Sequence, residues 1–362
     1  MIDGATSNVA LAAGKRIAIV GAGAVGSYTG GRMALAGADV TLIDPWPAHI
    51  EAIRAQGLQL SGMTPEESHT VKIKAMHVGD VQQIARQQPI DIAFICTISY
   101  DTEWATQLIR QYLAPDGVIV SLQNGINEDA IAAHIGADRV LGCIASLIAV
   151  ELHAPGCVKR LVPAGGAHHT VFHVGELDGR MSPRAEAIAA LLRAVDSATV
   201  TANLRGERWS KLVVNSMRNG LSAVTGMTGN QRDLDATARW LGIRLGSQAV
   251  RVGQALRLNL FAEQNMQPET LARAGEGDMA ARDEIEQLLI AFAHKRSDDQ
   301  RPSTAHDILR GRRTEIDYIN GYVAKKGRET GVDASLHVAI TELVKIIERG
   351  ELKPGPGLVA GL

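Results

Sequence analysis

The stretch RIAIVGAGAVG at residues 16–26 decides how this chain begins to fold. Residues typical of a buried strand run directly into the pattern G-x-G-x-x-G, and a helical segment opens from Val25. The first glycine permits a tight turn, the second lets a pyrophosphate approach the backbone, and the third lets the helix pack closely on the strand. Backbone amides at the start of the helix then face the phosphates. The pattern predicts dinucleotide binding by Gly21, Ala22, Gly23, Ala24, Val25 and Gly26.

Asp44 indicates which dinucleotide the turn would take, because it closes the second predicted strand 18 residues after Gly26. A carboxylate at this place accepts hydrogen bonds from the adenosine ribose and repels a 2'-phosphate. Residues 45–49 contain no lysine or arginine to bind that phosphate, although Arg54 follows further on. We therefore expect NAD rather than NADP. Two alternatives stay open, namely a glycine turn that serves packing alone and an Asp44 that caps a helix.

The segment from Arg16 to about Thr201 alternates short apolar runs with alanine-rich helical segments. Near-continuous apolar strands separated by helices predict an α/β domain with a doubly wound parallel sheet, covered by helices on both faces. Two later runs, Thr170–Gly175 and Ala198–Ala202, are expected to extend the sheet at its far edge. The four buried strands that carry this prediction are Arg16–Val20, Asp39–Ile43, Asp91–Ile95 and Gly117–Ser121.

After Leu204 strand-like runs disappear, and the remaining periodicity predicts an all-helical C-terminal domain. The predicted organisation is a disordered leader at 1–14, a dinucleotide-binding domain at 15–203, a helical substrate and catalytic domain at 204–352, and an irregular tail at 353–362. The expected helices are Glu207–Val224, Leu234–Leu258, Met279–His294, Thr314–Glu329 and Ala334–Glu348.

Composition excludes several classes of partner. The formal net charge of the 362 residues is only -2, which gives no reason to expect binding to nucleic acid or an anionic membrane. No apolar run approaches the roughly 18 residues of a spanning helix, and the leader lacks the features of a signal peptide. Three scattered cysteines suit a reducing compartment, so the cytoplasm is the expected location. We expect no metal, since His169 and His173 on one predicted strand have no third ligand at suitable spacing.

Polar residues on a predicted helix point to a substrate site. Lys211, Asn215 and Asn219 follow one another at intervals of four, so they form a slowly drifting stripe on a helix whose other residues look buried. Such a stripe either makes structural hydrogen bonds or faces a cleft. Asn124 and Thr97 each follow a predicted strand, at the same sheet edge as the glycine turn, where ligands of doubly wound sheets bind. An Asn-Gly pair is also a common turn.

With these pieces in place, the chain resembles the ketopantoate reductase (2-dehydropantoate 2-reductase) family from Gly21 to about Glu348. The resemblance implies a Rossmann-type domain, a helical domain and an active site between them. It also implies hydride transfer from a reduced nicotinamide to a 2-oxo acid, a place in pantothenate biosynthesis and a homodimer. The motifs that carry it are G-x-G-x-x-G at 21–26, Gln123-Asn-Gly125, K-L-x-x-N-x-x-x-N at 211–219, Pro302-Ser303, and TEIDYING at 314–321.

The resemblance also implies roles for single residues. Lys211 matches the catalytic lysine that hydrogen-bonds the keto oxygen and supplies a proton. Asn215 and Asn219 match substrate-binding asparagines, and Ser303 matches a serine that binds the substrate carboxylate. Asn124 matches an asparagine that touches both cofactor and substrate. Glu315 matches a glutamate that acts in catalysis near the nicotinamide ribose.

Departures from the family pattern leave the substrate open. Ile98 stands where many relatives carry a lysine beside the cofactor, which again favours NAD although the family habit is NADP. Gly220 replaces a usual proline, Ser303-Thr-Ala-His-Asp307 replaces Ser-Met-Leu-Gln-Asp, and the segment between Gln267 and Arg301 is longer. The leading hypothesis is reduction of 2-dehydropantoate to pantoate. The alternatives are NADH-dependent reduction of another branched or aromatic 2-oxo acid, and a regulator that senses NAD(P) without turnover.

Overall fold

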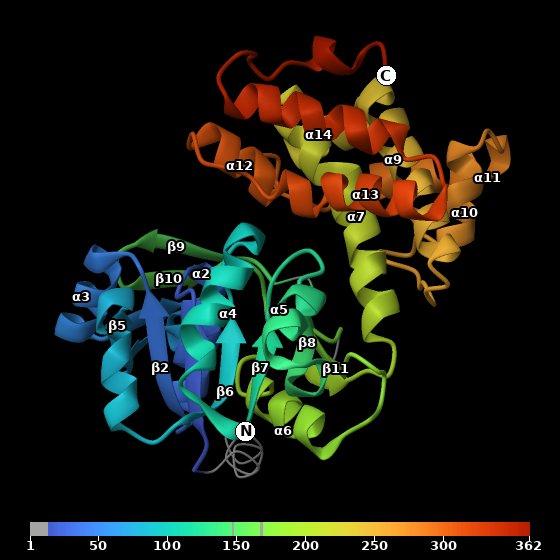
Figure 1. The fold of residues 1–362 in the computed structure, drawn as a ribbon. Coiled ribbons are helices and arrows are strands. Elements are labelled where there is room, and N and C mark those ends of the chain that lie inside the picture. Colours follow the sequence, from blue (N-terminus) through green and yellow to red (C-terminus); the bar gives the residue numbers. More distant parts are fainter. Residues whose placement is uncertain (1–13, 147, 167–168) are drawn as a thin grey trace. The chain divides into compact units, whose positions relative to one another are not determined.

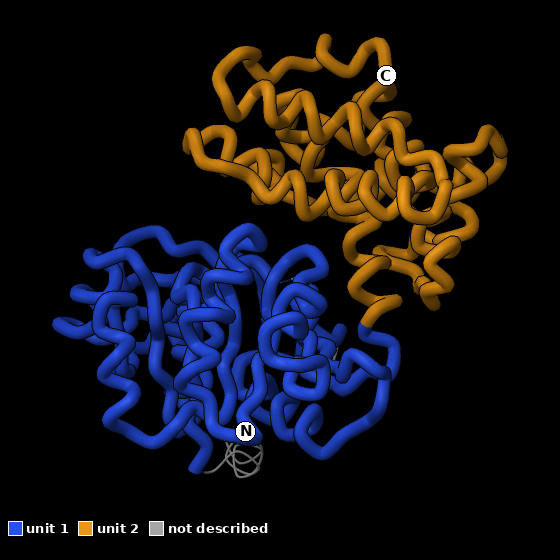
Figure 2. Tube along the Cα trace, viewed as in Figure 1, with its two compact units in different colours: residues 1–204 blue, residues 205–362 orange. Residues whose placement is uncertain are grey.

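The computed structural model describes residues 14–146, 148–166 and 169–362, so the predicted leader lies outside the described residues except for Gly14. The chain divides into two compact units, residues 1–204 and residues 205–362 (Figure 2). Within the described ranges, no helix combines the length and the apolar character that crossing a membrane requires.

An eight-stranded sheet forms the centre of the first unit, with the order β12-β11-β8-β7-β6-β1-β2-β5 (Figure 1). Among the described neighbours only β8 and β11 pair antiparallel, so the predicted doubly wound sheet is confirmed as a parallel-dominated one. The two late runs lie at its far edge, as expected. The strands are β1 (Arg16–Val20), β2 (Asp39–Asp44), β5 (Lys74–His77), β6 (Ile90–Ile95), β7 (Leu113–Ser121), β8 (Val140–Ala145), β11 (Phe172–Glu176) and β12 (Ala198–Val200).

Helices cover both faces of this sheet because its central strands are apolar on both sides. Ile17 and Ile19 of β1 face a core shared with α2, α3 and α6, whereas Ala18 and Val20 face a second core shared with α4, α5 and η3. The helical elements are α2 (Ala24–Leu35), α3 (Pro47–Gln56), α4 (Thr102–Arg110), α5 (Glu128–Ile135), α6 (Pro183–Leu192), η2 (Pro65–Glu67), η3 (Val78–Arg86), η4 (Ser99–Asp101) and η5 (Ala137–Arg139).

A second, four-stranded sheet that the sequence did not predict packs beside α2. A Cβ at Gly31 of α2 would lie 2.7 Å from Leu58 Cδ2, so the missing side chain lets β3 approach the helix. The strands are only three to five residues long, too short for their alternation to stand out. Their order is β4-β3-β10-β9, with β3 (Leu58–Ser61), β4 (His69–Val71), β9 (Val150–Ala154) and β10 (Cys157–Arg160).

The second unit is all-helical apart from one isolated bridge, which confirms the predicted class. The expected single helix Thr314–Glu329 is wrong: Ile319, at φ -111° and ψ -89°, separates η6 from α13. The elements are α7 (Leu204–Thr225), α8 (Gly229–Leu234), α9 (Ala236–Ala255), α10 (Pro268–Gly275), α11 (Met279–Ala293), α12 (Ser303–Leu309), α13 (Asn320–Thr330), α14 (Ser335–Glu348), η6 (Ile316–Tyr318) and η7 (Pro356–Val359).

Buried polar bonds connect the helices of this unit. Asn320 Nδ2 donates to Ser216 O at 2.9 Å and lies 3.1 Å from His337 Nδ1, and His337 Nε2 lies 2.9 Å from Leu245 O. With Nδ1 accepting, the proton sits on Nε2 and the imidazole is neutral. Burial lowers the pKa of His337 to about 4. The neutral ring therefore joins α7, α9, α13 and α14.

The stability of the protein should fall as the pH drops from about 6.5 toward about 4, because in that window the unfolded chain binds a proton at His337 that the folded chain does not. The loss should reach about 3 kcal/mol in the free energy of unfolding near pH 4. Urea unfolding of wild type and His337→Gln at several pH values measures this. An equal pH dependence in both proteins would contradict the assignment to His337.

Candidate functional site

The glycine-rich turn has the geometry that its sequence predicts. Gly21 has φ +93°, and a Cβ there would lie 2.7 Å from Thr97 N. A Cβ at Gly26 would lie 2.2 Å from Gly21 O, so a side chain at either position would push the turn apart. Gly21 N donates to Ile43 O at 2.9 Å, which ties the turn to the end of β2. These two glycines are required by the backbone itself.

The start of α2 can accept a phosphate group. Gly23 is the N-cap, no side chain caps the helix, and a Cβ at Gly23 would meet nothing within 4 Å. Ala24 and Val25 follow it and are partly exposed, whereas Ala22 is buried. The first amides of a helix lack intrahelical partners and favour an anion. The turn therefore fits the pyrophosphate of a dinucleotide.

Asp44 ends β2 beside this turn. Its Oδ1 accepts from Trp46 N at 2.9 Å, and the amides of Trp46 and Ala22 favour its charged form. Burial has the larger effect and raises the pKa of Asp44. The alternative of a helix cap is wrong, because the N-cap of α3 is Trp46 and no side chain caps it. The half-buried carboxylate therefore lies at the end of β2, beside the glycine-rich turn.

The guanidinium of Arg54 is occupied by hydrogen bonds to neighbouring residues. Its guanidinium donates to Ala75 O at 3.0 Å, Glu51 Oε1 at 2.8 Å and Asp80 Oδ2 at 2.8 Å. These bonds use Nε and both terminal nitrogens of Arg54. The side chain therefore connects α3 to β5 and η3.

Two loops follow the carboxyl ends of β6 and β7, at the same edge of the sheet as the glycine-rich turn. Gln123 Nε2 donates to Thr97 O and to Thr102 Oγ1, both at 2.9 Å. Asn127 Nδ2 donates to Asn124 O at 2.8 Å. Gln123 and Asn127 thus hold the loops that carry Thr97 and Asn124. Apart from the Gln-Asn-Gly motif, no sequence pattern pointed to either role. Gly21, Asp44, Thr97 and Asn124 lie at the ends of neighbouring strands, as predicted.

In the second unit, two residues of the stripe, Lys211 and Asn215, interrupt the buried part of α7. From Arg208 to Thr225 every residue is buried except Lys211 and Asn215, which are partly exposed. Asn219 is 7% exposed. Gly220 allows close packing, because a Cβ there would lie 2.5 Å from Ile340 Cγ2. Lys211 and Asn215 can therefore reach a ligand from a rigid, buried helix.

Ser303 and Glu315 lie on separate short elements of the same unit. Ser303 is exposed as the first residue of α12, after Pro302. Glu315 is 6% exposed and precedes η6, so it lies outside α13, although the sequence predicted one helix over Thr314–Glu329. Burial raises the pKa of Asp307 to about 6, and the charge of the neighbouring Glu315 is the second cause.

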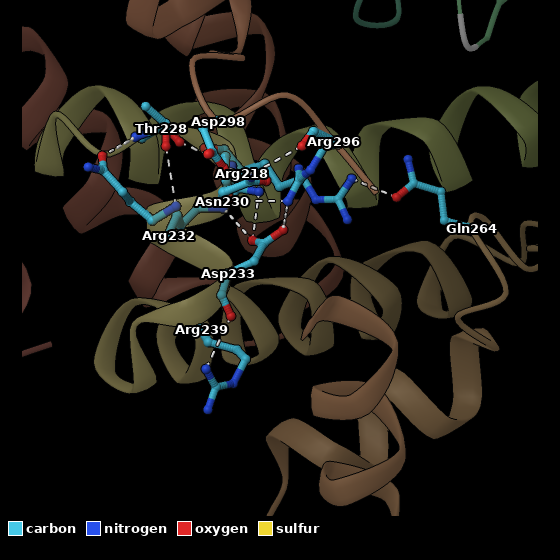
Figure 3. Close-up of polar contacts among 12 residues, drawn as sticks. Arg218, Thr228, Asn230, Arg232, Asp233, Arg239, Gln264, Arg296 and Asp298 are labelled. Carbon is cyan, nitrogen blue, oxygen red and sulfur yellow. Dashed lines mark hydrogen bonds and ion pairs between the residues drawn. The ribbon is translucent and has the colours of Figure 1, made fainter. Parts of the chain in front are cut away.

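A largely buried cluster of charged and polar residues supports the C-terminal half of the stripe (Figure 3). It consists of Arg218, Asn230, Arg232, Asp233, Arg296 and Asp298. Asp233 on α8 accepts from Arg232 Nε at 2.8 Å and from Arg296 Nη2. Arg218, between Asn215 and Asn219, donates to Gln264 Oε1 at 2.7 Å, and burial lowers the pKa of Arg218 to about 9.

The same cluster reaches the segment that leads to Ser303. Gly229 N donates to Gln300 O at 2.9 Å, and Asn230 Nδ2 donates to Asp298 Oδ1 at 2.8 Å. Both bonds fasten the loop before α12 to α8. The cluster joins residues far apart in the chain, so no local sequence pattern could have revealed it.

Among the described residues, no three His, Cys, Asp or Glu side chains gather where they could hold a metal ion. The predicted strand shared by His169 and His173 is wrong, because β11 begins at Phe172 and His169 precedes it.

Known proteins resemble the chain over nearly its whole length. The models "Ketopantoate reductase PanE/ApbA" and "Ketopantoate reductase PanE/ApbA C terminal" match residues 17–173 and 203–348. A 2-dehydropantoate 2-reductase of Archaeoglobus fulgidus is 30% identical and covers 93% of this chain and 99% of its own. One from Pyrococcus horikoshii is also 30% identical, over 92% and 97%.

Solved structures give the same picture. A PanE/ApbA family ketopantoate reductase from Ralstonia eutropha JMP134 aligns with a TM-score of 0.75 at 27% identity, covering 93% of this chain and 99% of that one. D-mandelate dehydrogenase with NADH and anilino(oxo)acetate aligns with a TM-score of 0.75 at 23% identity, covering 92% and 99%. At 23% identity, the likeness to D-mandelate dehydrogenase shows a shared fold.

Proposed function

Because the chain belongs to the ketopantoate reductase PanE/ApbA family, we propose that it reduces the keto group of a 2-oxo acid, with 2-dehydropantoate as the first candidate. It is an NAD(P)-dependent oxidoreductase. The observation that best supports the proposed reaction is the stripe on α7, where Lys211 and Asn215 are the partly exposed residues of an otherwise buried segment.

Lys211 is the proposed proton donor. When bound, the reduced nicotinamide supplies the hydride that adds to the keto carbon. Negative charge grows on the keto oxygen, where the ammonium of Lys211 stabilises it and delivers a proton from Nζ. The product is an alcohol, and the amine left on Lys211 regains its proton from water.

The remaining residues would bind and orient. Asn215 and Asn219 can donate or accept without carrying charge, which suits a polar substrate on a largely dry helix. Ser303 would bind the substrate carboxylate, and Glu315 the ribose beside the nicotinamide. The family resemblance implies that Asn124 would touch both ligands, and Asn127 holds its loop at the sheet edge.

We further propose NADH as the preferred cofactor. Asp44 would bind the adenosine ribose, and its charge would repel a 2'-phosphate. The engagement of Arg54 with Glu51 and Asp80 supports this, as does Ile98 at the position where many relatives carry a lysine.

The double substitution Asp44→Ser with Pro45→Arg should shift preference toward NADPH, because it removes a repulsive carboxylate and adds a cation. We expect the ratio of kcat/KM for NADH to that for NADPH to fall on the order of tenfold, about 1.4 kcal/mol. Initial rates with both cofactors measure it. Asp39→Ser, at the other end of β2, is the matched control and should leave the ratio unchanged. An unchanged ratio in the double variant would count against the role of Asp44.

A substrate panel tests the proposed function. Purified protein is mixed with NADH or NADPH and with 2-dehydropantoate or other branched and aromatic 2-oxo acids, while the nicotinamide absorbance is followed. Loss of absorbance with 2-dehydropantoate supports the leading proposal, and loss with another acid alone supports the related dehydrogenase. Cofactor binding with no loss for any acid would favour a sensor that does not turn over.

A homodimer in the cytoplasm completes the proposal. One structural relative, from Staphylococcus aureus, is described as a dimeric ketopantoate reductase, and its 16% identity bears on the fold alone. A molecular mass in solution equal to that of the monomer would contradict the proposed homodimer.

A further inference from the structure

Trp46 presents an unusual exposed ring beside the proposed cofactor site. It lies between Pro45 and Pro47, directly after β2, and is 43% exposed. The prolines restrict the backbone on both sides of it. Its indole stacks on the imidazole of His49, with ring centroids 5.6 Å apart and planes inclined by 13°. The ring is therefore fixed although much of its surface is open.

His49 is a rigid support for this ring. It is fully buried, its Nδ1 accepts from Gly156 N at 2.9 Å, and its Nε2 lies 3.1 Å from Ser27 Oγ. Because Nδ1 accepts, Nε2 carries the proton and donates to Ser27, whose hydroxyl donates to Ala22 O at 2.6 Å. This chain of hydrogen bonds links the turn before β10, the imidazole and the glycine-rich turn.

Trp46 closely follows the strand end that carries Asp44. Trp46 N donates to Asp44 Oδ1 at 2.9 Å, and Asp44 is the carboxylate proposed to bind the adenosine ribose. The adenine is attached to that ribose, so it must lie near the residues that follow Asp44. A flat, exposed aromatic ring held from below offers such a base a stacking face.

We propose that Trp46 stacks on the adenine ring of the dinucleotide, with the face of its indole that does not lie on His49. The proposal rests on the proposed function, because it requires a bound dinucleotide. It adds a binding contact to the base, separate from the phosphate contacts of the turn and the ribose contact of Asp44.

Ligand binding by wild type, Trp46→Ala and Trp46→Phe tests the stacking, with Trp104→Ala as a matched control. Trp104 is 42% exposed and lies on α4. Calorimetry with NADH and with ADP-ribose, which keeps the adenine and lacks the nicotinamide, should show Trp46→Ala weakening both by the same factor. That factor should be about 5- to 100-fold, the range of base–aromatic stacking. Trp46→Phe should recover most of the affinity, and Trp104→Ala should match wild type.

Each result decides the matter. Equal affinities of wild type and Trp46→Ala for ADP-ribose would overturn the stacking while leaving the proposed function intact. So would a loss confined to NADH, or a Trp46→Phe variant as weak as Trp46→Ala. A wild type that binds neither NADH nor NADPH would overturn the proposed function and the stacking together.

Discussion

Replacing Lys211 with alanine should lower turnover by about 100-fold or more, the usual contribution of a positioned general acid. The variant loses both the charge that stabilises the keto oxygen and the proton that completes the alcohol. The substitution should not unfold the protein, because Lys211 is only partly buried on a helix whose apolar residues are unchanged. Steady-state kinetics with the best acid of the panel measures the loss as a fall in kcat.

Two further variants separate the functions of the ammonium group. Lys211→Arg keeps the positive charge but cannot release a proton near neutral pH, so it should remain far below wild type. Lys326→Ala removes another lysine of the same unit, one paired with Glu329, and should keep wild-type turnover. Near-normal turnover in Lys211→Ala would refute the assigned role.

Replacing Asp233 with asparagine should destabilise the protein by about 3–5 kcal/mol, the cost of leaving buried charges without their partner. Its carboxylate is 4% exposed and accepts from both Arg232 and Arg296 (Figure 3). The asparagine has the same shape and lacks the charge. Urea unfolding gives the difference in free energy.

Asp298→Asn is the matched control for that experiment. Asp298 belongs to the same cluster, where it accepts from Asn230, but it lies on the exposed loop before α12. Its loss should cost well under 1 kcal/mol, as exposed charges usually do. Equal destabilisation by the two variants would mean that Asp233 is not the buried partner of the cluster. Because the cluster holds the loop that leads to Ser303, Asp233→Asn should also raise KM.

The sequence predicted the fold where its signals were local and strong. The strand Arg16–Val20 and the glycine turn follow from residues that are adjacent in the chain. The ketopantoate reductase family, suggested by the motifs at 21–26 and 211–219, is confirmed by the matching family models. The strands of the second sheet and the short helices α8, α10 and α12 escaped prediction because three to eight residues show too little periodicity.

The candidate site was predictable only in part. The residues that would touch ligands belong to motifs, but the residues that hold them in place do not. Gln123 and Asn127 act by hydrogen bonds across a loop, and Asp233 acts by an ion pair with the distant Arg296. Such contacts depend on tertiary packing, which no local pattern encodes. The break at Ile319, which separates Glu315 from α13, likewise overrides a helical periodicity.

Isotope transfer tests most directly whether this chain moves hydride to a 2-oxo acid with Lys211 as the acid. The protein is incubated with NADH deuterated at the transferable C4 position and with the 2-oxo acids of the panel, and the products are examined by mass spectrometry and NMR. We predict a 2-hydroxy acid that carries deuterium on C2, formed rapidly by wild type and at about one hundredth of that rate or less by Lys211→Ala. Bound NADH that passes deuterium to none of the acids would contradict the account.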